Sequence, residues 1–596
     1  MEDTPRRWSR RWLAAGAGTI LLAGGAIWLW TQRAPIATSY INDALTARNV
    51  PASYRLARVG FRTQRIENIR IGDPRNPDLV ADWAEIELAV GLAGVSIRAI
   101  DAGGVRLRGR VVGGKLSLGA IDRLLPKGKS DQPFTLPDIV LTSRGTRLDL
   151  ATPQGLVRAR LDGQGGLHDG FRGALAISSD RLVAGGCGLS TARAQLSLAI
   201  DAGHPTVRGP IEARTVACAD TLLDAPRIDF DARGDADLAR WRGTLAIKHG
   251  RVAAPDMQLG GLGGAITFDA SAGRLAGKVD LLTEQLRYSG TTGRYGVLRG
   301  NYSADPRAGS ADLVGEARVS GVKVDAALSK NWMRKAASAD GTPIGPIVAG
   351  WASAIRQATR SIDSSIRFTA HHGAQGGVVR VERLEAKGLG GGHLLVRGEG
   401  AEGLGWRWPK VGAVVNASIE LDGGGLPKMI MSLRQAVPGA SLTGSATFAP
   451  YQAGGARLRL APVLLGPSGD GGTSITTRVT LDGPLADGRV TGLDLPLSVR
   501  WSQRGAFVVN QRCVSIGFQR LAIAGTVIGQ SRLPLCPIDG ALVGWKGAGL
   551  YGGAHIAAPR LRGRVGDQPL TMEARSLTAR VARPGAGAPA RAAAPD

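Results

Sequence analysis

Hydrophobic and polar residues alternate along much of the chain, which is typical of β-strands that bury one face. In the run VRLRGRV (residues 105–111), Val105, Leu107 and Val111 fall on one side and three arginines fall on the other. In the similar run ARLRL (residues 456–460), Leu458 and Leu460 share one side. The same alternation returns at residues 157–162, 378–381 and 561–565. The pattern predicts a mainly β chain.

Asp-Gly steps punctuate these runs and predict tight hairpin turns. They begin at Asp162, Asp169, Asp422, Asp482, Asp487 and Asp539. Consecutive antiparallel hairpins are therefore the expected topology. At roughly 13 residues per strand and turn, the chain after residue 50 provides on the order of 35 strands, whereas a twisted sheet rarely exceeds about 10 without curling or splitting. We expect a long, elongated and curled antiparallel sheet.

Two segments have helical spacing instead. Residues 36–50 carry apolar side chains one helical turn apart and stop at Pro51, which predicts a short amphipathic helix. Residues 325–337 and 346–362 predict a helical insert, and the second of these has one apolar stripe. The insert either packs on the sheet as a helical pair or lines and gates a hydrophobic channel.

Residues 12–32 contain no charged side chain and would span about 30 Å as a helix, the thickness of a bilayer's hydrocarbon core. Trp12, Trp28 and Trp30 stand where interfacial aromatic residues belong. Four arginines precede the stretch, so the positive-inside rule places the N-terminus in the cytoplasm. A cleaved signal peptide is the alternative, but Pro35 is a poor cleavage context after Ala34. We expect a retained single-pass anchor.

These patterns divide the chain into seven predicted parts. They are a cytoplasmic basic tail (1–11), a transmembrane anchor (12–32), a juxtamembrane amphipathic helix (33–50), a first β region (51–324), a helical insert (325–365), a second β region (366–580) and a disordered Pro/Ala tail (581–596).

The composition changes this picture little. Of 596 residues, 86 are glycine, which suits a turn-rich sheet, and the net charge of +25 raises nucleic acid as a partner. The arginines are spread evenly, however, and the anchor places most of the chain outside the cytoplasm. We therefore expect no nucleic-acid partner. The arginines are expected to cover the solvated face of the sheet, with a secondary attraction to anionic lipid.

Four cysteines fall into two local couples, Cys187 with Cys218 and Cys513 with Cys536. In an oxidising compartment an even count suggests disulfides, and local pairing is the simplest of the three connectivities. Free thiols are the alternative. A metal site is less consistent with the sequence because no CxxC or CxH spacing is present.

The sequence contains no recognisable catalytic signature. The histidines are scattered, and the adjacent His371 and His372 have no ligand partner at metal spacing, so they suggest a loop turn. The glycine runs at residues 260–264 and 388–392 do not complete a phosphate-binding motif. We expect no catalytic residue, no metal and no cofactor, and therefore no enzyme.

Four segments carry a resemblance to a known family. Residues 66–82 follow the pattern I.NI.IGDP..PDL.AD shortly after the anchor, and further matches occur at residues 113–126 (GGKLSLGAIDRLLP), 341–348 (GTPIGPIV) and 511–537. With these features the chain resembles the YdbH-like proteins of the AsmA-like, TamB-like envelope group. Members are often labelled "dicarboxylate transport", but no residue here suggests a dicarboxylate site.

The resemblance implies a repeating β-groove whose apolar inner face carries glycerophospholipids between the inner and outer membranes of a Gram-negative envelope, and so maintains the outer membrane. The partners implied are phospholipid, the inner membrane and an outer-membrane or periplasmic protein. Most of the chain would lie in the periplasm. The expected lining includes Val105, Leu107, Val111, Leu458 and Leu460.

Three alternatives follow from the same features. Family members are expected to continue beyond the point where this chain enters its tail, so it would be a shortened homologue or a truncated product. The second alternative is a periplasmic scaffold or outer-membrane assembly factor that carries no lipid. A surface-exposed adhesin fits less well, because the anchor is N-terminal.

Overall fold

The structure is a computed structural model. It describes residues 45–580 except for residues 61, 92–93, 113–114, 125–135, 185, 325–338, 410–411, 470, 503–504 and 547–548. The fold divides into two compact units. The first takes in the chain to Ser289 together with Val297–Asp312, and the second takes in Gly290–Gly296 and the chain from Leu313 onward.

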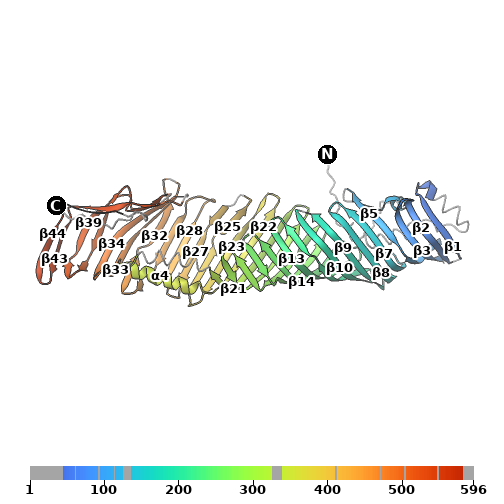
Figure 1. The fold of residues 1–596 in the computed structure, drawn as a ribbon, viewed down its shortest axis with the longest axis horizontal. Helices are drawn as coiled ribbons and strands as arrows, with labels where there is room; N and C mark the ends of the chain where they lie inside the picture. The colour runs from blue at the N-terminus through green and yellow to red at the C-terminus, as the bar shows by residue number, and fades with distance from the viewer. Residues whose placement is uncertain are drawn as a thin grey trace. The chain divides into compact units, whose positions relative to one another are not determined.

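Nearly all described residues belong to strands or the turns between them (Figure 1). The first strands are β1 (Ala52–Val59), β2 (Thr63–Asp73), β3 (Asn76–Gly91), β4 (Gly94–Gly103), β5 (Arg106–Val112), β6 (Lys115–Ser117), β7 (Val140–Thr152), β8 (Gly155–Gly166), β9 (Phe171–Ala184), β10 (Cys187–Asp201), β11 (His204–Glu212), β12 (Thr215–Cys218), β13 (Thr221–Gly234), β14 (Arg240–Ala254), β15 (Met257–Gly260), β16 (Gly263–Ser271), β17 (Arg274–Thr283), β18 (Gln285–Tyr288), β19 (Thr291–Gly293) and β20 (Tyr295–Asp305).

The later elements include one described α-helix, α4 (Gly345–Ala358). The strands around and after it are β21 (Ser310–Val324), β22 (Ile362–Gly373), β23 (Gly376–Gly388), β24 (His393–Gly398), β25 (Leu404–Trp408), β26 (Gly412–Val415), β27 (Ala417–Asp422), β28 (Met429–Arg434), β29 (Thr443–Phe448), β30 (Tyr451–Ala453), β31 (Ala456–Leu460), β32 (Val463–Pro467), β33 (Thr473–Leu485), β34 (Gly488–Trp501), β35 (Phe507–Val509), β36 (Val514–Phe518), β37 (Arg520–Ile523), β38 (Thr526–Ile528), β39 (Ser531–Ile538), β40 (Val543–Lys546), β41 (Gly549–Tyr551), β42 (Gly553–Ala557), β43 (Arg560–Val565), β44 (Gln568–Glu573) and β45 (Ser576–Arg580).

The predicted mainly β, antiparallel architecture is confirmed. Within the described residues there are 45 strands, more than the roughly 35 expected. The excess arises because long strands face partners that are broken into short pieces. Strand β10, for example, pairs with β11 along one half and with β12 along the other.

Strand β7 departs from the hairpin topology because it runs parallel to both β4 and β5. A parallel neighbour requires a crossover of about a dozen residues or more. The chain supplies this length after β6, beginning with the short 3-10 helix η1 (Gly119–Leu124). The expectation of hairpins throughout was therefore wrong at this point.

Two of the predicted Asp-Gly turns were also wrong. Asp162 lies inside β8 and Asp482 inside β33, and both stand where the strand pairing shifts register. An Oδ1 atom of Asp162 accepts a hydrogen bond from the backbone N–H of Gly145 at 2.5 Å, and Asp482 accepts one from Gly492 at 2.6 Å. Both glycines have positive φ. Each aspartate thus accepts a hydrogen bond from a backbone N–H that belongs to a β-bulge on the partner strand.

The two adjacent histidines are likewise in a strand rather than a loop turn. His371 and His372 belong to β22, which pairs with β23. The His372 ring stacks on Trp408 with ring centroids 6.1 Å apart. Among the described residues, no group of three or more His, Cys, Asp or Glu side chains is placed to hold a metal ion.

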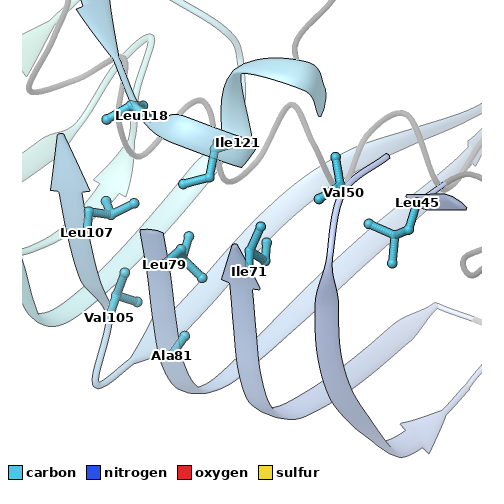
Figure 2. Packing of buried hydrophobic residues seen from close by; sticks show 9 residues of the cluster. All are labelled: Leu45, Val50, Ile71, Leu79, Ala81, Val105, Leu107, Leu118 and Ile121. Carbon is cyan, nitrogen blue, oxygen red and sulfur yellow. The ribbon is translucent and has the colours of Figure 1, made fainter. Parts of the chain in front are cut away.

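A buried cluster covers the inner face of the first strands (Figure 2). Leu118 and Ile121, from the segment around η1, lie over Leu79 and Leu107 of the sheet below. Asp78 fixes this segment, because its Oδ2 atom accepts a hydrogen bond from the Ala120 N–H at 2.8 Å. Over these first strands, the inner face of the sheet is therefore covered by protein side chains.

Both cysteine couples form disulfides in the structure. Cys187 and Cys218 are opposite each other on β10 and β12, and Cys513 is bonded to Cys536. Their sequence separations of 31 and 23 residues correspond to about 3–4 kcal/mol each in the chain-entropy account. The residues that the structure describes include no free cysteine.

Of the predicted juxtamembrane helix, the structure describes one turn that ends before Pro51, and its Leu45 and Val50 are buried in the cluster of Figure 2. No helix of the described ranges is long and apolar enough to cross a bilayer. The predicted anchor at residues 12–32, with Trp12, Trp28 and Trp30, lies outside those ranges, as does the tail at 581–596.

Candidate functional site: an apolar cavity in the first unit

An apolar cavity of about 160 Å³ opens on the inner face of the first unit. Its walls come mainly from β7 to β11, with one residue from β5 and two from the region where β14 begins. The lining residues are Leu107, Leu136, Leu141, Thr146, Leu148, Ala159, Leu161, Leu167, Phe171, Leu175, Leu198, Ile200, Pro205, Val207, Leu238 and Trp241. None carries a formal charge.

Strand alternation explains why the cavity is apolar. On β8, Ala159 and Leu161 point into the cavity, while Arg158 and Arg160, the residues before each of them, lie on the other face and are exposed. On β7, Leu148 lines the cavity and its neighbour Arg147 is exposed. One face of this single-layered sheet is therefore apolar, and the other carries cationic side chains.

One part of the cavity wall is tightly packed. Phe171 and Ile200 are almost fully buried, and they form a cluster with Leu136, Leu141 and Leu167. Apolar cavities of about 150 Å³ stay dry and take up small hydrocarbons. The cavity therefore has room for part of an acyl chain and not for a whole lipid.

Two polar side chains reach the cavity wall. Thr146 is buried, and its hydroxyl accepts a hydrogen bond from Ser143 at 2.7 Å. The Nε1 atom of Trp241 is also buried but has no hydrogen-bond partner among the described residues. The Trp241 ring packs so closely on Gly234 that a Cβ atom there would lie 3.0 Å from it. The indole N–H is therefore a fixed and unsatisfied donor, which costs about 1–3 kcal/mol.

The inner face of the second unit is filled where α4 lies on it. Ile347 of α4 is completely buried against Leu458 and Leu481, and Trp351 packs on Tyr451 with ring centroids 5.8 Å apart. The Tyr451 hydroxyl donates to the carbonyl of Gly425 at 2.7 Å, and desolvation by burial raises the pKa of Tyr451. The helix therefore packs on the sheet at this point, and these side chains form a buried cluster between them.

The five residues predicted to line a groove have different surroundings. Leu107 lines the apolar cavity and, with Val105, belongs to the cluster of Figure 2. Val111 is buried opposite Leu116 of β6. Leu458 and Leu460 belong to the second unit and pack in the cluster beneath α4. The cavity thus contains one of the five.

Several lining residues were missed from sequence. Leu161 belongs to a run that the alternation did identify at residues 157–162. Phe171 and Trp241 had no such signal, because each stands next to a turn where strand periodicity is too short to assign a face. Their roles depend on which strands lie side by side, and local pattern does not determine that.

A family model described as "YdbH-like: Intermembrane phospholipid transport protein YdbH" matches residues 20–593. No curated protein matches the chain, and no solved structure does.

Proposed function

The chain belongs to the YdbH-like family, an intermembrane phospholipid transport family and not an enzyme family, and from this premise we propose that the apolar cavity holds acyl chain of the transported lipid. The family assignment implies a phospholipid ligand. The observation that carries the proposal is the uncharged lining of the cavity, supplied by leucines from successive strands.

The energetics favour such a surface. Exposing about thirty lipid methylenes to water costs on the order of 25 kcal/mol at about 0.8 kcal/mol per methylene, so a lipid does not cross an aqueous gap unaided. A protein that covers the chain segment by segment lowers this barrier. Catalysis is not required, because the wall acts through its collective apolarity.

We further propose that the protein is anchored in the inner membrane by residues 12–32 and works in the periplasm of a Gram-negative cell. Three observations support this placement: the long uncharged N-terminal stretch, the basic residues before it, and the two disulfides, which form in oxidising compartments. An outer-membrane or periplasmic protein would complete the path.

One observation favours a second function, that of a scaffold or an outer-membrane assembly factor which carries no lipid. The inner face beneath α4 is filled by protein side chains, as expected for a closed core. If this state persists during function, the second unit would support other envelope components rather than hold lipid.

Site-specific photo-crosslinking distinguishes the two functions. A benzophenone amino acid is placed at Leu107 or Leu161 in the cavity, at Arg208 or Arg251 as controls, because these exposed arginines do not line the cavity, and at Leu458 beneath α4. Phospholipid adducts at the first two positions and not at the controls would support transport. Absence of lipid at both cavity positions in folded protein would contradict it. An adduct at Leu458 would mean that α4 moves aside during transport.

A further inference from the structure

A second hollow, of about 600 Å³, lies on the first unit and shares only Leu107 and Ala159 with the lining of the apolar cavity. Six arginines and one acidic residue, Asp149, surround it, which leaves five net positive charges at neutral pH. This arginine hollow is formed by Arg106, Arg108, Arg147, Arg158, Arg160 and Arg193. These side chains alternate with the residues of the apolar cavity along β5, β7 and β8, so the hollow lies on the outer face of the sheet.

The arginines stand in register across neighbouring strands. Arg106 of β5 is paired with Arg147 of β7, which is paired in turn with Arg160 of β8. Like charges directly opposite each other destabilise a sheet. This row therefore carries a cost in the unliganded protein.

Other arginines of the same unit stand opposite acids instead. Arg208 contacts its cross-strand neighbour Asp231 at 3.0 Å, and Arg251 contacts Asp224 at 3.3 Å. Within the hollow, Arg158 and Arg160 form ion pairs with Asp180 and Asp162.

Of the remaining four arginines of the hollow, Arg106 and Arg147 have no acidic residue opposite them, whereas Arg108 faces Asp149 and Arg193 faces Glu212 across the strands. Among the described residues, no ion pair involves Arg106, Arg108, Arg147 or Arg193. All four side chains are exposed, so an anion can reach them from solvent.

We propose that the arginine hollow binds a ligand that presents two or more phosphate groups. Guanidinium groups bind phosphate oxygens through paired, charge-assisted hydrogen bonds. Neighbouring strands are about 4.8 Å apart and alternate residues of one strand about 6.6–7 Å apart, so two phosphates can be held at adjacent positions. The phosphates could come from a soluble polyphosphate or from the headgroups of a lipid surface. The site does not depend on lipid in the apolar cavity.

The test uses the full chain in phosphatidylcholine nanodiscs. Tripolyphosphate binding is measured by calorimetry, and binding to a lipid surface by co-sedimentation with sucrose-loaded vesicles of phosphatidylglycerol or of phosphatidylcholine. The hollow variant combines Arg106→Gln, Arg147→Gln and Arg160→Gln. The control variant combines Arg208→Gln, Arg251→Gln and Arg299→Gln, which removes the same charge from arginines that do not line the hollow.

We expect the hollow variant to bind tripolyphosphate or phosphatidylglycerol vesicles about tenfold more weakly, or more weakly still. The affinity of the control variant should stay within about twofold of that of the unchanged protein. Loss of tripolyphosphate binding identifies a soluble source. Loss of binding to phosphatidylglycerol vesicles alone identifies a lipid surface. Binding of neither probe by the unchanged protein, or equal losses in both variants, would overturn the proposal.

A second measurement needs no substitution and covers the case in which the hollow variant does not fold. Phenylglyoxal modifies exposed arginines, and mass spectrometry locates each adduct. Tripolyphosphate or phosphatidylglycerol vesicles should protect Arg106 and Arg147 at least fivefold and leave Arg208 unprotected. Equal modification of all three with and without these anions counts against the hollow as a site.

Discussion

At the scale of single residues, Trp241 is the side chain in the apolar cavity that most resembles a ligand-recognition group. Its indole N–H is buried and has no partner among the described residues, while the cavity around it is lined by leucines. The ester oxygens of a glycerophospholipid are hydrogen-bond acceptors. A lipid that enters the cavity can therefore satisfy a donor that the protein leaves unsatisfied.

Replacing Trp241 by phenylalanine keeps most of the ring and removes this donor. We expect phospholipid affinity to fall about three- to tenfold, since such a hydrogen bond contributes about 0.5–1.5 kcal/mol. The lipid-free protein should be unchanged or slightly more stable, because an unsatisfied group is gone. Displacement of a fluorescent phospholipid and thermal unfolding measure the two effects. Trp545→Phe, at an exposed position, serves as the control, and equal loss of affinity in both variants would contradict this role.

Glu385 gives a residue-level prediction of pH dependence. Lys387, Arg383 and His393 form hydrogen bonds with its carboxylate and lower the Glu385 pKa to about 2 from an ordinary value of 4.5. The folded-state pKa is depressed, so the stabilisation is present above about pH 4.5 and is lost as the pH falls toward 2. The carboxylate is partly exposed, with 23% of its side-chain surface accessible, and solvent screening keeps the effect small.

The Glu385→Gln variant tests this dependence. Its midpoint of thermal unfolding should lie below that of the unchanged protein at pH 6, and the gap should close by pH 2. Glu382 is on the same strand and exposed, so the unfolding midpoint of Glu382→Gln should differ little from that of the unchanged protein at either pH. A gap for Glu385→Gln that is the same at both pH values would contradict the assignment.

At the scale of secondary structure, α4 is the element whose position decides whether the second unit can hold lipid. The helix is attached through one apolar stripe, and Ile347 in its first turn has no exposed surface. The sheet beneath it has the same alternating pattern as the sheet of the first unit. Displacement of α4 would therefore expose an apolar face.

Ile347→Ala should weaken this attachment by about 2–5 kcal/mol, the usual cost of truncating a buried aliphatic side chain. Hydrogen exchange should become faster in α4 and in β31 beneath it, and lipid crosslinking at Leu458 should increase. Ile355 is on the same helix but 40% exposed, so Ile355→Ala should change both measurements little. If the exchange rates stay unchanged in Ile347→Ala, the helix is held by other contacts.

Some sequence patterns predicted the structure correctly and others did not. Alternation correctly placed Leu107 and Val111 of β5, and Val105 just before it, on the buried side, because a strand's period of two is a local property. The Asp-Gly signal for hairpin turns was wrong at Asp162 and Asp482, which lie inside strands opposite a β-bulge. Which leucines share a cavity depends on strand order and register, and these are set by contacts between segments distant in sequence.

At the scale of the whole molecule, residues 12–32 are predicted to meet a membrane, and the described residues begin at residue 45. Deleting residues 1–33 should move the protein from the membrane fraction to the soluble periplasmic fraction, while its disulfides still form if an export signal is supplied. Fractionation with carbonate washing and a thiol-labelling assay check this. Retention of the deleted protein in the washed membranes would mean that another segment anchors it.

The two faces of the first unit share one layer of backbone, and this restricts how the sequence can change in length. Inserting a single residue into β7 or β8 would turn every following side chain of that strand to the opposite face, so that arginines would enter the apolar cavity and leucines the arginine hollow. A single-residue insertion or deletion is therefore tolerated in a turn. Within these strands, only an insertion or deletion of two residues keeps every side chain on its face. The bulge opposite Asp162 is the exception, because it already accommodates one odd residue without turning the strand over.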